Sequence, residues 1–316
     1  RKGFEDTRGT LFFEIARIAK EKRPKAMLLE NVKGLINHDR GNTLDLMIET
    51  LNEIGYVIDF EVLNSKYFGV PQNRERIFIV AIREDLIEAE PFNEEATTGN
   101  TIVPKGKRRI GEWAKTFNFD WPEQGEVTTR LRDILEHEVD EKYYLDEDKT
   151  AKLVAQLDDR ETKDTPEMDM LGHIDIRGND SIKRVYSTDG IGNALTTMGG
   201  GHREPKIAEV RPVLTPDRMV KRQNGRRFKD DGEESFTLTS QDRHGVALGN
   251  PPKYRIRKLT PLECWRLQGF PDEAHDAVMN AGISDSQRYK QAGNAVTVNV
   301  IEAIGERLIP MLNEFA

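Results

Sequence analysis

Apolar positions near the start of the chain predict a helix followed by a strand. Residues 10–22 carry apolar side chains at helical spacing, and Arg23-Pro24 ends the helix. The run 26–32 is apolar enough for a strand that is buried on both faces. A helix followed by a buried strand is typical of an α/β protein. The expected apolar face of the helix comprises Leu11, Phe12, Ile15, Ile18 and Ala19.

The next segment adds one helix and two strands. Asn42 is expected to cap the helix, and Gly55 is expected to end it. Strands are expected near residues 56–63 and 76–83, which are again predominantly apolar. The expected buried face of the helix comprises Leu44, Met47, Ile48 and Leu51.

Periodicity weakens between residues 85 and 255, where turn residues accumulate. A helical island over 131–139 and 146–157 is surrounded by short strand-like pieces. Two of these, 193–197 and 236–240, resemble copies of one hairpin edge, although coincidence and duplication carry equal weight for so short a repeat. We expect a smaller, mostly β domain over 85–255.

The last part of the chain, 256–316, is regular again. Thr260-Pro261-Leu262-Glu263 has the sequence of a capping box with proline at the first helical position, which predicts a helix start. A final helix is expected over 297–313. The smaller domain is therefore expected to be inserted into a large domain made of 1–84 and 256–316. The expected buried stripe of the final helix comprises Val300, Ile301, Ile304, Leu308 and Leu312.

The distribution of charge along the chain is more informative about possible partners than the net charge. The net charge of -8 argues against nucleic acid, because phosphate binding requires lysine and arginine. Basic residues nevertheless cluster in three runs, at 105–109, 221–229 and 255–258. Each run alone is more often a solvated surface, but three together suit a basic cleft on an acidic body.

Other features of composition exclude several classes of protein. A single cysteine excludes an internal disulfide, and the six histidines have no ligand spacing, so we expect no structural metal. No apolar run approaches the roughly 20 residues that cross a bilayer. The chain begins with Arg1 rather than methionine, so we expect further sequence upstream. We expect a cytoplasmic protein.

Two short segments carry polar groups that could act on a ligand. Glu30 ends a strand expected to be buried, a place where ligands bind in open α/β sheets and a carboxyl group can serve as a general acid. A salt bridge at the sheet edge explains Glu30 equally well. Arg74 and Arg76 alternate at the entry to a strand, so both should point to one side of the sheet and suit a base edge or a phosphate. An ion-pair ladder on an edge strand is the alternative.

A third segment, Gln291-Ala292-Gly293-Asn294-Ala295-Val296, leads toward the last helix. A Gly-Asn turn at a helix N-terminus exposes backbone N–H groups, which favours a carboxylate or a polar ligand tail. Most such turns are only caps, so the pattern is weak on its own.

Taken together and in order, these motifs resemble the DNA cytosine-5 methyltransferase family. The resemblance extends to Gly3–Thr10, Leu11 and Phe12, a stretch similar to the one that follows the family's catalytic loop. It covers essentially the whole chain, although residues 85–255 match only in layout. The motifs that carry it are Leu29-Glu30-Asn31-Val32, Gln72-Asn73-Arg74-Glu75-Arg76, Arg257-Lys258-Leu259-Thr260-Pro261-Leu262-Glu263-Cys264-Trp265-Arg266-Leu267-Gln268-Gly269-Phe270-Pro271 and Gln291-Ala292-Gly293-Asn294-Ala295-Val296.

The resemblance implies a role for each motif. Glu30 is similar to the glutamate that binds ring nitrogen 3 and the exocyclic amine of a flipped cytosine, and Arg76 to the arginine that holds the base carbonyl, with Arg74 supporting the same pocket. It implies part of a Rossmann-like domain with an inserted target-recognition domain. The implied cofactor is S-adenosyl-L-methionine, with S-adenosyl-L-homocysteine as the product. Positions similar to cofactor contacts are Leu11, Asn294, Ala295 and Val296.

The family's Pro-Cys nucleophile and its Gly-rich cofactor loop are not found in residues 1–316. We therefore expect the nucleophile from an upstream segment, in the same chain or another, and no catalysis by residues 1–316 alone. Cys264 lies in the first turn of the expected capped helix, a place that lowers a thiol pKa, but its apolar neighbours indicate a packed helix.

Double-stranded DNA is the expected partner, with a role in a restriction-modification system or as an orphan enzyme near the bacterial nucleoid. The Thr-Leu pair that the family uses on DNA appears as Ala194-Leu195 in the first hairpin edge and Thr237-Leu238 in the second. A non-catalytic DNA-targeting subunit and a transfer-RNA methyltransferase of the same family are alternatives. Glu30 and Arg76 argue against the first, and the long middle segment argues against the second. The expected DNA contacts are Arg8, Arg226, Arg227, Lys229, Thr237, Leu238 and Gln241.

Overall fold

The computed structural model describes residues 7–157, 167–198, 202–210, 212–214, 244–246 and 254–315, which form two compact units of mixed α and β structure. Unit 1 comprises Arg1–Asn64, Glu75–Gln124 and Val300–Ala316, and unit 2 comprises Ser65–Arg74 and Gly125–Asn299. These units divide the chain at other points than the expected boundaries at 84 and 256, since 85–124 belongs to unit 1 and 256–299 belongs to unit 2.

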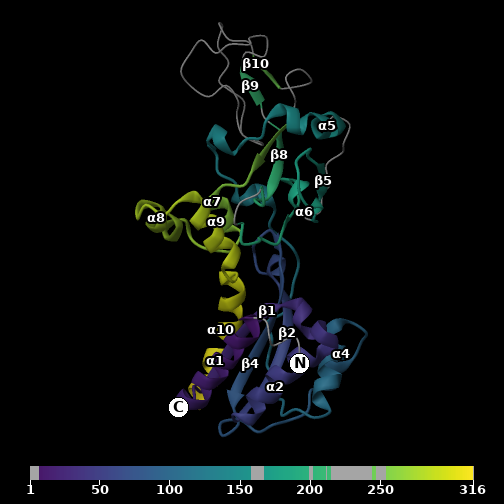
Figure 1. Ribbon diagram of the computed structural model, residues 1–316, viewed down its shortest axis with the longest axis vertical. Helices are drawn as coiled ribbons and strands as arrows, with labels where there is room; N and C mark the ends of the chain where they lie inside the picture. The colour runs from purple at the N-terminus through teal and green to yellow at the C-terminus, as the bar shows by residue number, and fades with distance from the viewer. Residues whose placement is uncertain are drawn as a thin grey trace. The chain divides into compact units, whose positions relative to one another are not determined.

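A three-stranded sheet with the order β1-β4-β2 organises unit 1 (Figure 1). Both strand pairs are antiparallel, with Glu30 opposite Phe78 and Val32 opposite Arg76. The strands expected from the sequence are confirmed almost to the residue. The elements of unit 1 are α1 (Thr7–Lys22), β1 (Ala26–Val32), the 3-10 segment η2 (Lys33–Gly41), α2 (Asn42–Glu53), β2 (Tyr56–Asn64), β4 (Glu75–Arg83), α3 (Glu94–Thr97), α4 (Ile102–Gly111) and α10 (Val298–Glu314).

Residues after β4 stay with unit 1 because they complete its sheet and core. Thr116 forms a parallel bridge with Ile58 of β2. The backbone N–H of Phe119 and the indole N–H of Trp121 both donate to the Asp59 carboxylate, at 2.9 and 2.8 Å. Weak periodicity after residue 85 therefore marked irregular structure and not a change of domain.

The apolar core of unit 1 lies between the sheet, α2 and the segment containing α4. All four residues expected on the buried face of α2 are buried. Asn42 is the first residue of this helix and not its cap, because Gly41 occupies the N-cap position with φ +96° and no side-chain cap bond. Gly55 follows the helix with φ +87°, as expected of a C-terminal stop.

The expected buried face of α1 is only partly correct. Phe12 and Ala19 are buried with Ala16, but Leu11, Ile15 and Ile18 are 65 %, 42 % and 52 % exposed. The apolar residues of this helix lie on more than one of its faces, so periodicity alone could not select the face that packs on the described part of unit 1. β1 is likewise only half-buried over Ala26–Glu30, whereas a strand buried on both faces was expected.

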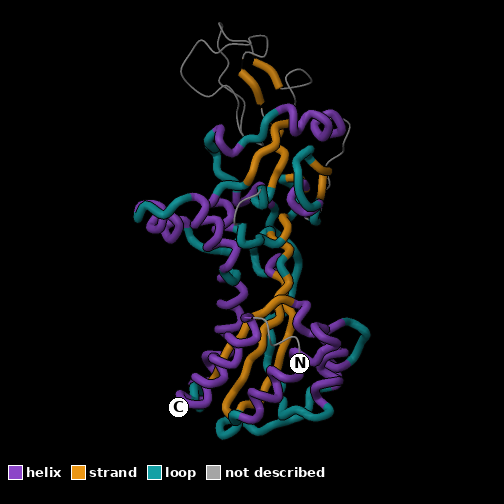
Figure 2. Tube along the Cα trace, in the orientation of Figure 1, coloured by secondary structure: helices purple, strands orange, loops and turns teal. Residues whose placement is uncertain are grey.

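Unit 2 contains a four-stranded sheet with the order β11-β8-β6-β5, drawn in orange in Figure 2 together with the shorter strands. The helix expected from the capping box is confirmed as α7. Among the described residues of the chain, no helix is long and apolar enough to cross a membrane. The elements of unit 2 are η3 (Ser65–Tyr67), β3 (Gln72–Asn73), η4 (Leu131–Ile134), η5 (Glu141–Tyr143), α5 (Glu147–Leu157), β5 (Met170–His173), α6 (Asp180–Lys183), β6 (Arg184–Ser187), β7 (Gly192–Asn193), β8 (Lys206–Val210), β9 (Pro212–Leu214), β10 (His244–Val246), β11 (Tyr254–Lys258), α7 (Pro261–Arg266), α8 (Asp272–Asn280) and α9 (Asp285–Asn294).

A buried charge network joins the sheet of unit 2 to α7. The Arg257 guanidinium donates to Glu209 at 2.6 Å and to both oxygens of Glu263 at 2.7 Å, with Arg257 and Glu263 fully buried. Glu263 also accepts from the backbone N–H of Thr260, which completes the capping box. Burial by itself lowers the pKa of Arg257, but Glu263 and Glu209 outweigh it and hold the pKa above its ordinary value. The cap of α7 and the last strand of the sheet thus share one cation.

Arg257→Met is expected to lower the free energy of unfolding by about 3–5 kcal/mol, because it leaves buried carboxylates without their cation. Arg255→Met is the matched control two residues away on β11, since Arg255 pairs at 2.7 Å with Glu141, whose side chain is 76 % exposed. An exposed pair contributes about 0–1 kcal/mol. Urea unfolding of both variants measures the difference. Equal losses would contradict the importance of burial at Arg257.

Candidate active site

Glu30 and Arg76 form an ion pair on one face of the sheet of unit 1. Arg76 lies opposite Val32, two residues beyond Glu30 on β1, so the two side chains are diagonal neighbours on the same face. The distance from Arg76 Nε to a Glu30 carboxylate oxygen is 2.9 Å. The Glu30 side chain is 27 % exposed and the Arg76 side chain is 19 % exposed, so the pair is partly open to solvent. A half-buried carboxylate beside a planar donor suits recognition of a polar ring edge.

A second ion pair joins the residues that flank the Glu30–Arg76 pair. Lys33 and Glu75 form an ion pair at 2.7 Å, and Arg76 Nη1 donates to the backbone carbonyl of Glu75 at 2.8 Å. These contacts fix the end of β1 against the start of β4. Glu75 thus contributes its backbone carbonyl to Arg76 and its carboxylate to Lys33.

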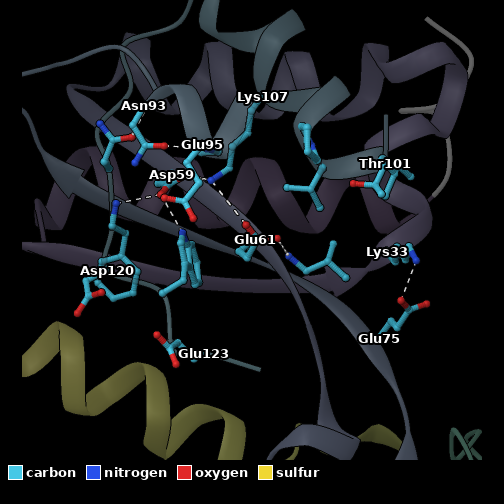
Figure 3. Close-up of a pocket in the computed structure, with 18 residues that line it drawn as sticks. Lys33, Asp59, Glu61, Glu75, Asn93, Glu95, Thr101, Lys107, Asp120 and Glu123 are labelled. Carbon is cyan, nitrogen blue, oxygen red and sulfur yellow. Dashed lines mark hydrogen bonds and ion pairs between the residues drawn. The ribbon is translucent and has the colours of Figure 1, made fainter. Parts of the chain in front are cut away.

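Lys33 and Glu75 also line a cavity of about 760 Å³ in unit 1 (Figure 3). Inside it, the buried Lys107 ammonium lies 2.8 Å from Asp59 and 3.8 Å from Glu61. Burial raises the pKa of the Asp59 and Glu61 carboxyls, although Lys107 lowers both. Acidic residues outnumber basic ones in the lining, so this cavity does not suit a phosphate backbone.

Arg74 does not lie beside Arg76 on the sheet, which corrects the expectation of a shared side. It precedes β4, and its side chain is buried among backbone carbonyls of unit 2. Nη1 donates to Leu195 O at 3.0 Å, and Nη2 donates to Ala295 O at 2.9 Å and to Gly293 O at 3.4 Å. The regular alternation of a strand fails here because the chain passes from one compact unit to the other between Arg74 and Glu75.

The segment 292–297 also differs from expectation. Gly293 and Asn294 end α9 and do not form the first turn of the last helix, which begins at Val298. The N–H of Ala295 donates to Gln291 O at 3.0 Å, and the N–H of Val298 donates to Gln268 O at 2.8 Å. These two backbone donors are therefore not available to a ligand. The Asn294 side chain is exposed, while Ala295 and Val296 are half-buried.

Three buried polar side chains connect this segment to its neighbours; Gln72 and Gln268 belong to the motifs quoted above, and Thr297 was not singled out from the sequence. Gln268 Nε2 donates to Ala292 O at 2.7 Å, and Thr297 Oγ1 donates to Gln268 Oε1 at 2.9 Å. Gln72 Nε2 donates to Leu267 O at 2.7 Å, and Gln72 Oε1 accepts from the N–H of Leu195 at 3.0 Å. For Thr297, the available signal was a polar residue between Val296 and Val298.

Cys264 is fully buried in α7. Burial raises the pKa of its thiol well above the ordinary range, and the nearby Glu263 adds to this effect. A buried neutral thiol is a poor nucleophile. The sequence-based rejection of Cys264 as a catalytic residue agrees with these surroundings.

The remaining expected site residues are scattered or not described. Leu11 lies on α1 with an exposed side chain, and Arg8 lies in the first turn of the same helix. Leu195, from the first hairpin edge, has a buried side chain, and its backbone bonds to Gln72 and Arg74. The expected DNA contacts Arg226, Arg227, Lys229, Thr237, Leu238 and Gln241 lie outside the described residues.

Comparison with known proteins gives one consistent result. The family model for C-5 cytosine-specific DNA methylase matches residues 1–310. The chain is 59 % identical over 315 residues to the orphan methyltransferase M.SPBetaI of Bacillus phage SPbeta, covering 96 % of this chain and 70 % of that protein. It is 31 % identical over 313 residues to the type II methyltransferase M.HhaI of Haemophilus parahaemolyticus, covering 99 % and 72 %.

A solved structure is similar in fold. The Dnmt2 methyltransferase of S. pombe aligns with a TM-score of 0.53 and 18 % identity, over 96 % of this chain and 72 % of that one. The family match over residues 1–310 agrees with the order of the sequence motifs, and two of those motifs meet in the Glu30–Arg76 pair. The chain belongs to the C-5 cytosine-specific DNA methylase family and is a DNA (cytosine-5) methyltransferase.

Proposed function

We propose that the chain methylates cytosine at carbon 5 after the base has been flipped out of a DNA duplex, using S-adenosyl-L-methionine and a covalent cysteine adduct. The Glu30–Arg76 pair carries this proposal. A Glu30 carboxyl can donate a proton to ring nitrogen 3 and accept from the exocyclic amine, while Arg76 binds the base carbonyl. Protonation makes carbon 6 electrophilic enough for a thiolate, and attack there turns carbon 5 into an enamine nucleophile.

S-adenosyl-L-methionine would supply an electrophilic methyl group to that carbon. The segment 293–296 fits a contact with it, because its backbone is fixed from the buried side by Arg74 and Gln268 while Asn294 faces solvent. Leu11 offers an exposed apolar surface that suits the same ligand. In this proposal, Leu11, Asn294, Ala295 and Val296 bind the cofactor, within a Rossmann-like domain.

The nucleophile would come from a segment other than residues 1–316. Cys264 is the single cysteine of the chain, and it is buried with a raised thiol pKa. The exposed apolar stripe Leu11, Ile15 and Ile18 on α1 is the kind of surface that another folded segment covers. An upstream segment that packs on α1 would explain the stripe and supply the cysteine.

Sequence recognition is assigned to the inserted domain, with Arg226, Arg227 and Lys229 on phosphates and Thr237, Leu238 and Gln241 on base edges. Arg8 would add a phosphate contact from α1. The relatives named as orphan and type II methyltransferases favour this role over the transfer-RNA alternative. Retention of Glu30 and Arg76 disfavours a subunit that only targets DNA, since binding alone does not require a base-activating pair.

The test combines methylation mapping with DNA binding. Bisulfite sequencing of DNA from a host that expresses the complete enzyme should reveal 5-methylcytosine at one short motif. Neutralising Arg226, Arg227 and Lys229 should weaken binding to all sequences and lower the salt slope by about one unit per lost phosphate contact. Changes at Thr237 and Gln241 should instead alter the methylated motif, because a base-edge contact discriminates by about 1–3 kcal/mol.

The two sets of variants distinguish contacts with the DNA phosphates from contacts that recognise the base sequence. If both sets leave binding and the methylated motif unchanged in a folded protein, the assignment of these residues is wrong. Methylation at scattered cytosines without a motif would contradict the proposed sequence specificity itself.

A further inference from the structure

Arg74 joins two segments of unit 2 that have different proposed duties. One is Leu195–Thr197, from the first hairpin edge of the recognition domain, and the other is Ala292–Thr297, the proposed cofactor segment. The Arg74 guanidinium donates to Leu195 O on the first and to Gly293 O and Ala295 O on the second, at 3.0, 3.4 and 2.9 Å. The Arg74 side chain is buried, so water cannot readily replace it at these carbonyls.

A second polar connection runs beside the first. Gln72 accepts from the N–H of Leu195 and donates to Gln268 Oε1 at 3.4 Å, and Gln268 donates to Ala292 O. Both glutamine side chains are fully buried. Displacement of Leu195 therefore disturbs Arg74, which bonds to the cofactor segment directly, and Gln72, which reaches that segment only through Gln268.

The two segments are in close backbone contact as well. A Cβ built on Gly293 would lie 1.8 Å from Thr196 O and 2.9 Å from Thr197 Cα. No side chain fits at this position unless the segments separate, because the obstacle is backbone and not a flexible side chain. The backbones of the two segments are therefore in direct contact at Gly293.

We propose that Arg74 is a positioning residue that couples cofactor binding to DNA binding, by making the Ala292–Thr297 and Leu195–Thr197 segments move as one. This inference rests on the proposed function of the two segments. Arg74 then acts through main-chain carbonyls and does not touch the flipped base. By linkage, DNA bound against the recognition domain raises cofactor affinity by the same factor as cofactor raises DNA affinity.

The test measures this coupling factor by calorimetric titration of the complete enzyme with S-adenosyl-L-homocysteine. The titration is made with and without saturating, sheared, unmethylated genomic DNA. The wild-type enzyme is expected to bind the ligand at least about fivefold more tightly in the presence of DNA, the lower end of typical coupling. In Arg74→Met the factor is expected to fall below about twofold, with circular dichroism confirming that the variant is folded.

Two further variants keep the proposal open to contradiction if Arg74→Met does not fold. Gly293→Ala forces the segments apart while Arg74 stays, so it should lose the coupling as well. Arg266→Met is the matched control, because Arg266 also donates to backbone carbonyls of unit 2, those of Ile134 and Leu135, but to none in either coupled segment. This control should keep the wild-type coupling factor even if it is less stable.

The outcomes are distinct for the two proposals. Coupling retained in folded Arg74→Met and in Gly293→Ala overturns the role of Arg74 while leaving the proposed function intact. Equal loss of coupling in Arg266→Met reduces the effect to general destabilisation and also overturns it. A wild-type enzyme that binds no S-adenosyl-L-homocysteine contradicts the proposed function itself.

Discussion

Purified residues 1–316 are expected to transfer no methyl group to DNA, and addition of the segment that carries the nucleophile is expected to restore transfer. The reason is the state of Cys264, the single thiol of the chain, which is buried in α7 with a raised pKa. Without covalent attack at carbon 6, carbon 5 of cytosine is not nucleophilic enough to accept a methyl group. Incorporation of label from tritiated S-adenosyl-L-methionine into DNA measures the effect.

The control for this experiment is Cys264→Ala. In the restored enzyme this change removes only a buried side chain, so methyl transfer should persist if the variant folds. Strong transfer by residues 1–316 alone that disappears in Cys264→Ala would show that the assignment of the nucleophile is wrong.

Glu30→Gln in the complete enzyme is expected to slow methyl transfer by about 10²- to 10⁴-fold, the range for loss of a general acid. The amide keeps the shape of the side chain and can still contact Arg76, but it cannot deliver a carboxyl proton to the ring. DNA binding should change little, because the proposed contact of Glu30 is with the flipped base and not with the phosphates. Single-turnover rates and equilibrium binding separate the two effects.

Glu61→Gln is the matched control for Glu30→Gln. Glu61 lies on β2 of the same sheet, and its side chain has the same exposed fraction, 27 %. It faces Lys107 in the acidic cavity and has no proposed contact with the base. A similar fall in rate for both variants, or a parallel loss of DNA binding in Glu30→Gln, would indicate a structural role for Glu30.

Sequence patterns predicted those elements whose determinants are local. The capping box at Thr260 and Glu263 specifies a helix start within four residues, and the structure has it there. The strand 26–32 and the final helix were predicted nearly to the residue, because apolar runs and stripes of that length have few other interpretations. The family resemblance implied that Glu30 and Arg76 contact the same base but did not predict their ion pair, which their places on β1 and β4 make geometrically possible.

The failures concern choices that depend on distant partners. Leu11 and Ile15 are apolar, yet the described part of unit 1 packs on the other side of their helix. Arg74 and Arg76 alternate in sequence, yet they have partners in different units. Gly293 and Asn294 read as the start of a helix but end the preceding one, because α9 continues through them. The exposed face of α1 and the separation of Arg74 from Arg76 are decided by segments far away in the chain, which no local pattern contains.

If unit 2 carries the proposed sequence recognition, the excursion of Ser65–Arg74 into unit 2 limits how sequence specificity can be exchanged between relatives. A chimera that replaces only 85–255 would cut unit 1 after residue 84 and leave Gln72 and Arg74 to meet a foreign Leu195 segment. A graft that respects the compact units carries two pieces, Ser65–Arg74 and Gly125–Asn299, and leaves Glu75–Gln124 with the recipient. Under that proposal the interchangeable module is discontinuous in the sequence, so recombination at a single pair of crossover points would not transfer it intact.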